Sequence, residues 1–276
     1  MSLTLQQKTN YDGFPKPAEL IEITGAHALE ASDRAYLNLF YQRAHDSGRL
    51  AEPGAKFEMT FTEARQGWSR HKGNERIQDS MDRLLRVVVS VPYISAHTGK
   101  PRTLKTHLFD FIDTDDEDSP GSTIRFGIPD ELRPILVRSG RWGRIKAEVV
   151  CSMTSKYAIA LYEMVQLRAN RDNCVDVFTY PDFRERLGVP PGAYEDGSNF
   201  RLKVIEPALL EVNGLSDFGV TIELRRRHPR APIHEVAIGW WRKQGDEFRA
   251  AMQERGRSKI GRKARLRGTV EAITEQ

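Results

Sequence analysis

The order of the predicted elements most constrains the fold, because one order occurs twice along the 276 residues. In the first half, a helix from Ser32 to about His45 precedes a short strand at Lys56–Met59. A capping-box pattern at Thr60–Glu63 opens a short helix to about Gly67. A polar turn at Ser69–Asn74 leads to a longer helix from Asn74 to about Val88. Three β-rich stretches follow, at Val87–Ile94, Leu104–Ile112 and Thr123–Ile128.

The second half repeats this order without repeating the letters. Its expected elements are a helix at Thr154–Ala169, a strand at Val175–Phe178, a helix from Thr179 through Leu187 with Pro181 in its first turn, a helix at Asn199–Asn213 capped by Ser198, and strands at Val220–Arg226 and Ile233–Trp241. Helix, turn, helix and hairpin is the order of a winged helix-turn-helix. We therefore expect an α+β fold with two tandem winged-helix domains, at residues 1–146 and 147–245, and a helix with a basic tail at residues 246–276.

In each half, the longer helix carries an apolar stripe at helical spacing. The stripe positions are Ile77, Met81, Leu84, Leu85 and Val88 in the first half and Phe200, Val204, Ile205, Ala208 and Val212 in the second. Pro207 lies inside the second helix and should kink it. Of the adjacent Trp240 and Trp241, one should face the core and the other should be partly exposed.

Charge is unevenly distributed. The formal net charge is +4, but residues 201–276 hold 16 Lys and Arg against 10 Asp and Glu, a local net charge of +6. Seven of the 13 residues from Arg255 to Arg267 are basic, and we expect this tail to be mobile, either as an arm along DNA or as a solubilising segment. In contrast, five of the six residues at Asp113–Asp118 are acidic, as in a solvated hairpin loop. This asymmetry favours a polyanionic partner on one face.

Three sets of polar side chains are candidates for DNA contact. They are Lys72, Asn74, Arg76 and Gln78 at the start of the first long helix, Ser198, Asn199, Arg201 and Lys203 at the start of the second, and Arg225, Arg226, Arg227 and Arg230 in the hairpin turn after it. Such side chains near a helix N-terminus can reach base edges in the major groove, while hairpin arginines typically meet phosphate. The alternative at each place is an ordinary amphipathic helix or charged hairpin with a solvated face.

Other classes of protein fit the sequence less well. No apolar run is long enough to cross a bilayer and no secretory pattern opens the chain, so we expect a cytoplasmic protein. Cys151 and Cys174 form no CxxC pair and are interpreted as partly buried free thiols. The seven histidines include no HxH pair of the kind that rolling-circle nucleases use, so we expect no metal, no cofactor and no enzymatic activity.

The second half resembles the theta-type iteron-binding initiators of plasmid replication, known as RepA, RepB or RepE proteins. The likeness rests on Ser155–Glu163, Phe183–Gly188, Tyr194, Phe200, Glu206–Asn213 and Ser216–Asp217. The first half matches more loosely, through Arg83–Val89 and Ile128–Leu132. Together the likeness covers roughly residues 18 to 245 and leaves out the basic tail.

The resemblance implies two winged-helix domains in a pseudo-symmetric arrangement. It also implies monomers that bind direct repeats at an origin of replication, open it, and act with the host initiator DnaA and the replicative helicase. Homodimers, in equilibrium with these monomers, would bind the operator of the protein's own gene and repress it, with the dimer contact in the N-terminal domain. Two alternatives remain: a dimeric transcriptional repressor without origin activity, and a nicking initiator that cleaves DNA.

Overall fold

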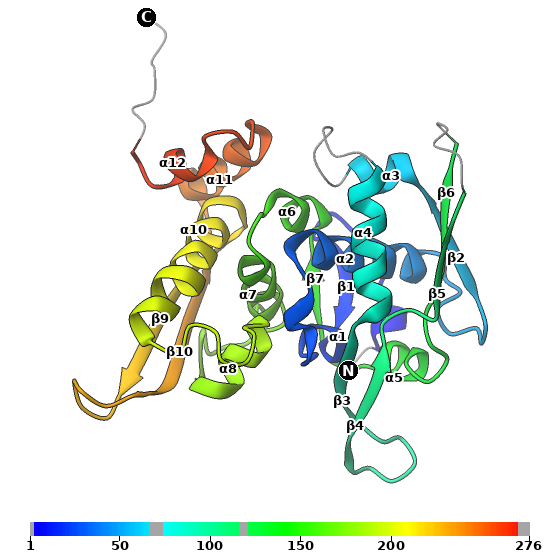
Figure 1. Cartoon of the computed structure of the whole chain (residues 1–276), viewed down its shortest axis with the longest axis horizontal. Helices are drawn as coiled ribbons and strands as arrows, with labels where there is room; N and C mark the ends of the chain where they lie inside the picture. The colour runs from blue at the N-terminus through cyan, green and yellow to red at the C-terminus, as the bar shows by residue number, and fades with distance from the viewer. Residues whose placement is uncertain (1–2, 67–73, 116–120, 270–276) are drawn as a thin grey trace, which may run out of the picture.

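The structure is a computed structural model that describes residues 3–66, 74–115 and 121–269. Two units lie side by side, the first on the right of Figure 1 and the second on the left. Each unit contains a three-stranded antiparallel sheet and several helices. Most buried apolar residues of both units belong to one continuous hydrophobic cluster, so the two units share a core.

The first unit has the order of elements that the sequence predicts. Its elements are α2 (Ala31–Asp46), β2 (Lys56–Thr60), α3 (Phe61–Gln66), α4 (Asn74–Arg86), β3 (Val88–Ile94), β4 (Pro101–His107), β5 (Phe111–Thr114) and β6 (Thr123–Gly127). The sheet order is β2–β6–β5, and β3 and β4 form a separate hairpin. The predicted turn at Ser69–Asn74 lies almost wholly outside the described residues.

The second unit repeats the topology. Its elements are α7 (Lys156–Gln166), β8 (Val175–Thr179), α8 (Tyr180–Leu187), α9 (Gly197–Phe200), the π-helical turn η3 (Arg201–Ile205), α10 (Glu206–Leu215), β9 (Phe218–Arg226) and β10 (Ile233–Arg242). The sheet order β8–β10–β9 matches that of the first unit, with the last strand in the centre. The prediction of two tandem winged-helix domains is therefore confirmed.

The remaining elements before α7 are short. They are η1 (Thr4–Gln6), β1 (Phe14–Pro17), α1 (Ala18–Ile21), η2 (Ala26–Ala28), α5 (Arg133–Val137), β7 (Trp142–Ile145) and α6 (Ala147–Ser152). Strand β1 pairs with β7, and α2 packs against both α6 and α7. The domain boundary after residue 146 stays a prediction.

Local sequence accounts for several helix ends. Thr60 Oγ1 accepts a hydrogen bond from the Glu63 amide at 3.1 Å, and Glu63 accepts one from the Thr60 amide at 2.7 Å, which confirms the capping box. Thr179 caps α8 through the Asp182 amide. Gly188 ends α8 with φ +74°, a left-handed conformation that glycine adopts without a Cβ clash.

Two predicted segments of the first unit have different ends. Helix α4 stops at Arg86, and Val88 is an exposed residue of β3 rather than part of the helical stripe. The consecutive β-branched residues Val87 to Val89 favour an extended chain there. The expected strand Leu104–Ile112 is two strands, because Leu108 and Phe109 turn into the core between β4 and β5. Helix α2 is capped by Glu30 and not by Ser32.

The C-terminal segment is not the mobile tail that its charge predicts. After α11 (Gly245–Gly256), helix α12 (Arg262–Leu266) packs near α10, where the Leu266 side chain lies against Gly214. Arg262 is only 4% exposed and donates to the carbonyl oxygens of Ser152, Glu254 and Arg257 at 2.9, 3.1 and 2.9 Å. Main-chain acceptors on α6 and at the end of α11 therefore hold the basic chain in place.

The burial of individual side chains tests the predictions for the tryptophans and the cysteines. Trp240 is buried and Trp241 is partly exposed, as expected. The two thiols differ, since Cys151 is buried and Cys174 is exposed. Burial raises the pKa of Cys151 to about 12, so its thiolate is disfavoured.

No helix within the three described segments is long and apolar enough to cross a membrane.

Candidate nucleic-acid interface

One helical run, from α9 through η3 to α10, presents exposed cations in the second unit. Its predicted stripe is confirmed, because Phe200, Val204, Ile205, Ala208 and Val212 are all buried. The stripe faces α7, α8 and the sheet, and the ring of Phe200 meets Tyr180 edge-on with centroids 5.2 Å apart. At the N-terminal end of the run, the opposite side is exposed to solvent.

That opposite side presents Arg201, Leu202 and Lys203. The Arg201 side chain is 70% exposed, and its Nε lies 3.3 Å from Glu206 Oε1. Leu202 is 55% exposed and Lys203 is exposed. Two cations beside an apolar side chain can contact guanine acceptors, phosphates and the thymine methyl group.

The N-terminus of this run is capped by Asp196 and not, as predicted, by Ser198. Asp196 Oδ1 accepts from the amides of Ser198 and Asn199 at 3.0 and 2.9 Å. An aspartate is as good a cap as a serine, and here the aspartate comes earlier in the chain. Because Asp196 satisfies these amides, the exposed side chains of Ser198 and Asn199 are not used for capping.

Pro207 changes the helix in a way that the sequence only partly indicates. A proline has no amide hydrogen, and its ring clashes with the carbonyl group four residues earlier, here that of Lys203. The chain widens into the π-helical turn at Arg201–Ile205, just before the proline. This turn contains Arg201, Leu202 and Lys203, so the distortion falls on the exposed segment itself.

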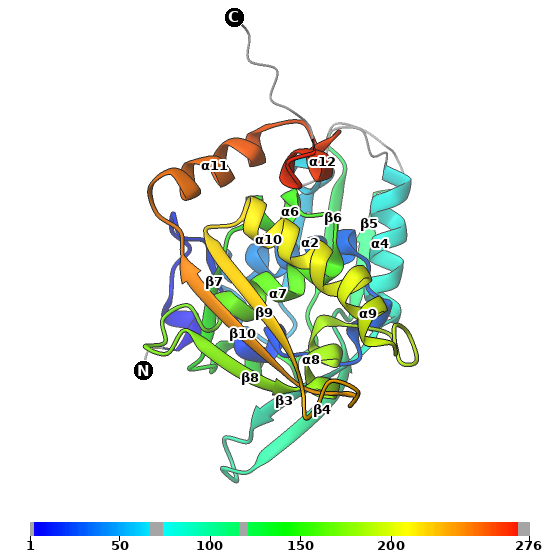
Figure 2. The same cartoon turned by 90° about the vertical axis from the view of Figure 1, so that its left-hand side faces the viewer.

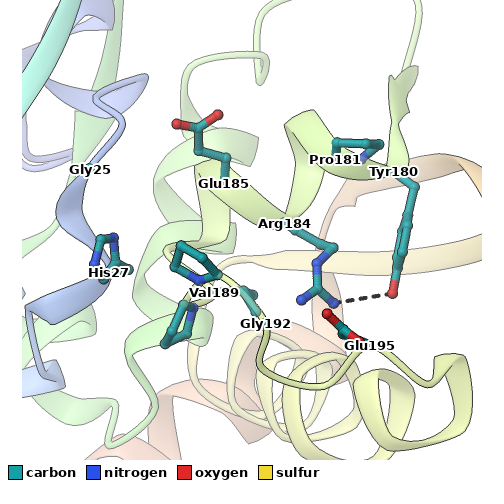
Figure 3. A pocket seen from close by; sticks show the side chains of 11 residues that line it. Gly25, His27, Tyr180, Pro181, Arg184, Glu185, Val189, Gly192 and Glu195 are labelled. Atoms are coloured by element: carbon teal, nitrogen blue, oxygen red, sulfur yellow. Dashed lines mark hydrogen bonds between the residues drawn. The ribbon is translucent and has the colours of Figure 1, made fainter.

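Arg184 fixes the loop that leads into the run. Its guanidinium donates to the Tyr180 hydroxyl at 3.2 Å, to the Tyr194 carbonyl at 2.8 Å and to the Ala193 carbonyl. Tyr194 has φ +54°, a conformation that costs energy in a residue with a side chain. Figure 3 shows Arg184 and Tyr180 in a pocket of about 520 Å³, which Gly25 and His27, at the start of η2 and within it, also border.

The hairpin between β9 and β10 brings the predicted arginines to one tip. Arg227 and Arg230 are exposed, whereas Arg225 pairs with Glu223 at 3.0 Å. Arg226 donates to the Ala231 carbonyl at 2.6 Å, and its guanidinium lies over Gly197, where a Cβ would be 2.7 Å from Nη2. The arginine hairpin therefore touches the N-terminus of the helical run, and the structure brings these two predicted sets together.

The first unit supplies its candidates on α4. Gln78 is exposed on this helix, and Ile77, Met81 and Leu84 are buried beneath it. Asn74 and Arg76 belong to its first turn, and Lys72 lies outside the described residues. Arg83 holds the helix on α2, since its Nε and Nη2 donate to the buried Asp33 carboxylate at 2.7 and 2.9 Å. Leu85 is only partly buried.

The two candidate helices lie on the same side of the molecule. Helix α4 and the α9–α10 run are both toward the viewer in Figure 1, and α4 and α9 both lie at the right of Figure 2. Helix α11 lies at the opposite side in Figure 2. Both helices therefore lie on one side of the molecule, away from α11.

The hairpins of the two units differ in charge. In the β5–β6 hairpin, Asp113 pairs with Arg125, and Asp115 Oδ2 accepts from the Thr123 amide at 2.7 Å. The sequence between them adds Asp116, Glu117 and Asp118, which lie outside the described residues. The corresponding β9–β10 tip, from Arg225 to Arg230, consists of arginines with one histidine and one proline.

Sequence reasoning missed Leu202, Asp196 and Arg184. Leu202 lies between cations in the sequence, and a kink at Pro207 does not by itself indicate that this position is exposed. Asp196 could have been found from the Asp-Gly-Ser-Asn pattern, which offers two caps within three residues. No local signal identifies Arg184, because its partners depend on how the loop folds back onto α8.

Comparisons with known proteins agree with this architecture. The family described as "Initiator Replication protein, WH1" matches residues 16–166, and "Initiator Rep protein, WH2" matches residues 179–240. The structure is similar to that of the Pi initiator protein in complex with iteron DNA, with a TM-score of 0.63, 12% identity, and coverage of 84% of this chain and 97% of that one.

A second structure, of domains 2 and 3 of RctB, gives a TM-score of 0.44 at 13% identity and covers 76% of this chain and 80% of that one. No curated protein sequence matches the chain.

Proposed function

The chain belongs to the family of initiator replication proteins with WH1 and WH2 domains, and from this membership we propose that it binds direct repeats, or iterons, in the double-stranded DNA of a plasmid origin. The first of the two family matches alone covers more than half of the chain. The Pi initiator protein, whose fold is similar, is bound to iteron DNA in its crystal structure.

One observation carries the proposal. The exposed segment Arg201–Lys203 lies on the same helical run whose N-terminus is touched by Arg226 of the arginine hairpin. A helix in the major groove reads base edges, and a cationic hairpin beside it meets the phosphates of the groove wall. Side chains for sequence reading and for charge neutralisation therefore lie together on one surface.

The first unit extends this contact. Helix α4 lies on the same side of the molecule as α9, so a duplex bound to the second unit would also lie beside the first. In the proposed complex the two helices enter successive major grooves, about one helical turn apart. The protein acts by binding and needs no catalytic step of its own.

Further parts of the proposal concern the consequences of binding. Bound copies destabilise the adjacent A·T-rich duplex and recruit the host initiator DnaA and the replicative helicase in the cytoplasm. A homodimer in equilibrium with the monomer represses the protein's own gene at its operator. These partners follow from the family resemblance of the Ser155–Glu163 and Phe183–Gly188 segments.

A gel-shift titration tests the proposal with a duplex that carries the tandem repeats beside the gene and a shuffled duplex of equal length. We expect affinity for the repeats to be at least about a thousandfold higher at physiological salt. Equal affinity for both duplexes would contradict the proposal. Binding to an inverted repeat alone, without replication when the gene is supplied in trans, would instead indicate a dimeric repressor.

A further inference from the structure

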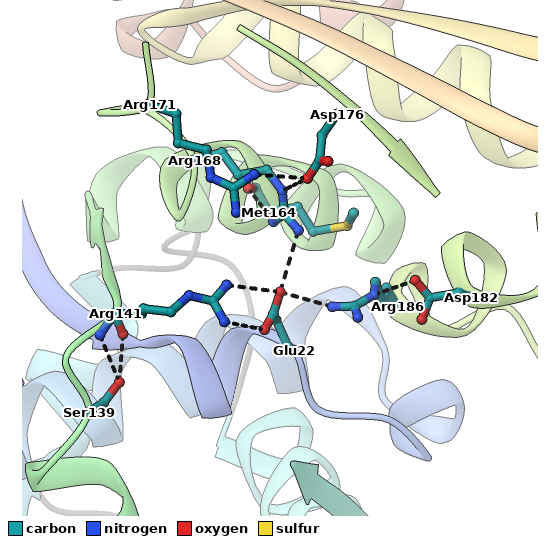
Figure 4. Close-up of polar contacts among 9 residues, drawn as sticks. All are labelled: Glu22, Ser139, Arg141, Met164, Arg168, Arg171, Asp176, Asp182 and Arg186. Carbon is teal, nitrogen blue, oxygen red and sulfur yellow. Dashed lines mark hydrogen bonds and ion pairs between the residues drawn. The ribbon is translucent and has the colours of Figure 1, made fainter. Parts of the chain in front are cut away.

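A carboxylate of the first unit, Glu22, lies between arginines at the junction of the two units. Glu22 directly follows α1, and its side chain is only 13% exposed. Three guanidinium groups surround it in Figure 4, those of Arg141, Arg168 and Arg186. Arg168 follows α7 and Arg186 lies on α8, so two of the three belong to the second unit.

Glu22 forms ion pairs with all three guanidinium groups. Its Oε1 lies 3.0 Å from Arg186 Nη1 and 3.4 Å from Arg168 Nη2, and its Oε2 lies 3.4 Å from Arg141 Nη1. One carboxylate thus contacts α8, the end of α7 and the segment before β7. A rotation of one unit against the other would lengthen some of these contacts.

The two arginines of the second unit are held by acids of their own unit. Arg168 Nε lies 2.6 Å from Asp176 Oδ2, and its Nη1 donates to the Met164 carbonyl at 3.0 Å. Arg186 Nε lies 2.8 Å from Asp182 Oδ2. Burial alone would lower the pKa of Arg186, but Asp182 and Glu22 raise it above its usual value. Glu22 therefore contacts two arginines that acids of the second unit also hold.

A second buried contact runs in the opposite direction. Glu163 of α7 accepts from Lys16 Nζ at 2.7 Å and from Asn38 Nδ2 at 2.6 Å, and the Lys16 and Glu163 side chains are almost fully buried. Each unit thus inserts one carboxylate among polar donors of the other. Buried ionic contacts add little net stability, but they can favour one arrangement over others.

We propose that Glu22 is a positioning residue that fixes the rotation and separation of the two winged-helix units, and so sets the spacing between the two grooves that the chain reads. The proposal rests on the proposed function, because it assumes that both units contact one duplex. Arg186 links Glu22 to the helix that is proposed to contact DNA. Arg186 lies on α8, and α8 shares a buried core with the α9–α10 run through Phe183 and Phe200.

A spacing series tests the proposal. The probes are single repeats with zero, one or two base pairs inserted between the segments facing α4 and α9, and each inserted pair rotates the second groove by about 35°. The variant Glu22→Gln removes the charge and keeps the shape. We expect wild type to lose at least about tenfold in affinity for each insertion, and Glu22→Gln to lose less than about threefold.

Glu254→Gln is the matched control. Glu254 is also nearly buried, with a 9% exposed side chain, and it contacts Arg265, Arg262 and Arg257 at 2.7, 3.5 and 3.6 Å. All four residues belong to the C-terminal segment, so none of these contacts crosses the junction. This variant should keep the wild-type spacing penalty, even if it is less stable.

The outcomes separate the two proposals. If wild type ignores the repeats, the proposed function falls and this inference with it. If wild type reads the repeats and Glu22→Gln shows the same spacing penalty, only the inference is overturned.

A measurement without DNA covers the case in which Glu22→Gln binds poorly. Spin labels at Cys174 in the second unit and at Glu58→Cys on β2 would report the distance between the units, while the buried Cys151 is protected from labelling. We expect a narrow distance distribution for wild type and Glu254→Gln, and a broader one for Glu22→Gln. An equally narrow distribution in Glu22→Gln would overturn the inference.

Discussion

The two winged-helix units have the same sheet order, β2–β6–β5 and β8–β10–β9, yet their hairpins have opposite charge. The tip between β9 and β10 presents Arg227 and Arg230 to solvent, whereas the segment between β5 and β6 is rich in Asp and Glu. Phosphate attracts the first and repels the second. Equal topology therefore does not give equal roles, and the second unit is the better suited to surround a groove.

The long helices of the two units also differ. Helix α4 is a regular helix held on α2 by the Asp33–Arg83 ion pair. The α9–α10 run is held by its apolar stripe and contains a π-helical turn that exposes two cations and Leu202. We infer that the second helix dominates sequence reading and that the first adds a weaker contact. Substitutions in each helix test this ranking.

The largest effect is expected at Arg201 and Lys203. Each alanine substitution should cost about 1–3 kcal/mol on the specific repeat if the side chain reads a base, and much less on a shuffled duplex. Dissociation constants on the two duplexes, measured at one salt concentration, give the comparison.

Arg249→Ala is the matched control for Arg201→Ala. Arg249 is 69% exposed and pairs with one acid, Asp246, as Arg201 pairs with Glu206, but it lies on α11, at the left of Figure 2 and opposite α4 and α9. Affinity should be nearly unchanged. Equal losses on specific and shuffled DNA for Arg201→Ala would remove it from base reading.

The sequence predicted what depends on periodicity. The stripe from Phe200 to Val212 repeats at helical spacing, and all its predicted positions are buried. The capping box at Thr60 was found because its partner lies only three residues away. Helix ends were harder where two signals compete, as with Ser198 and Asp196, or where β-branched residues continue a helical pattern, as at Val88.

Contacts between distant segments could not be predicted. Arg262 is buried against the Ser152 carbonyl, 110 residues earlier in the chain, and a main-chain acceptor leaves no trace in the sequence. The basic run therefore looked mobile. Glu22 and Arg168 are 146 residues apart, and nothing local marks either as part of a junction. Composition indicates the sign of the charge on a surface, while the fold decides which cations are exposed on it.

The second largest effect is expected in the arginine hairpin. Arg227→Gln with Arg230→Gln should weaken binding to all duplexes alike. The double variant should also make the negative slope of log affinity against log salt shallower by about 1.8, because each phosphate that the protein no longer neutralises reduces the magnitude of the slope by about 0.9. Titrations over a series of salt concentrations around the physiological value measure the slope. An unchanged slope would show that the tip does not lie on phosphate.

Arg226→Gln sharpens this test. Arg226 is bound to the Ala231 carbonyl and lies over Gly197, so its loss should disturb the N-terminus of the α9–α10 run. We expect it to weaken binding to the repeat more than to shuffled DNA, unlike its neighbours.

The smallest effect is expected at Gln78 in the first unit. This exposed side chain is neutral, and one neutral hydrogen bond to a base contributes about 0.5–1.5 kcal/mol. Gln78→Ala should therefore weaken specific binding less than Arg201→Ala, without changing the salt slope. If Gln78→Ala is instead the more damaging substitution on the repeat, the first unit is the main reader. In that case the charge of the hairpins would determine only the phosphate contacts. The π-helical turn of the α9–α10 run would then not make the second unit the main reader of sequence.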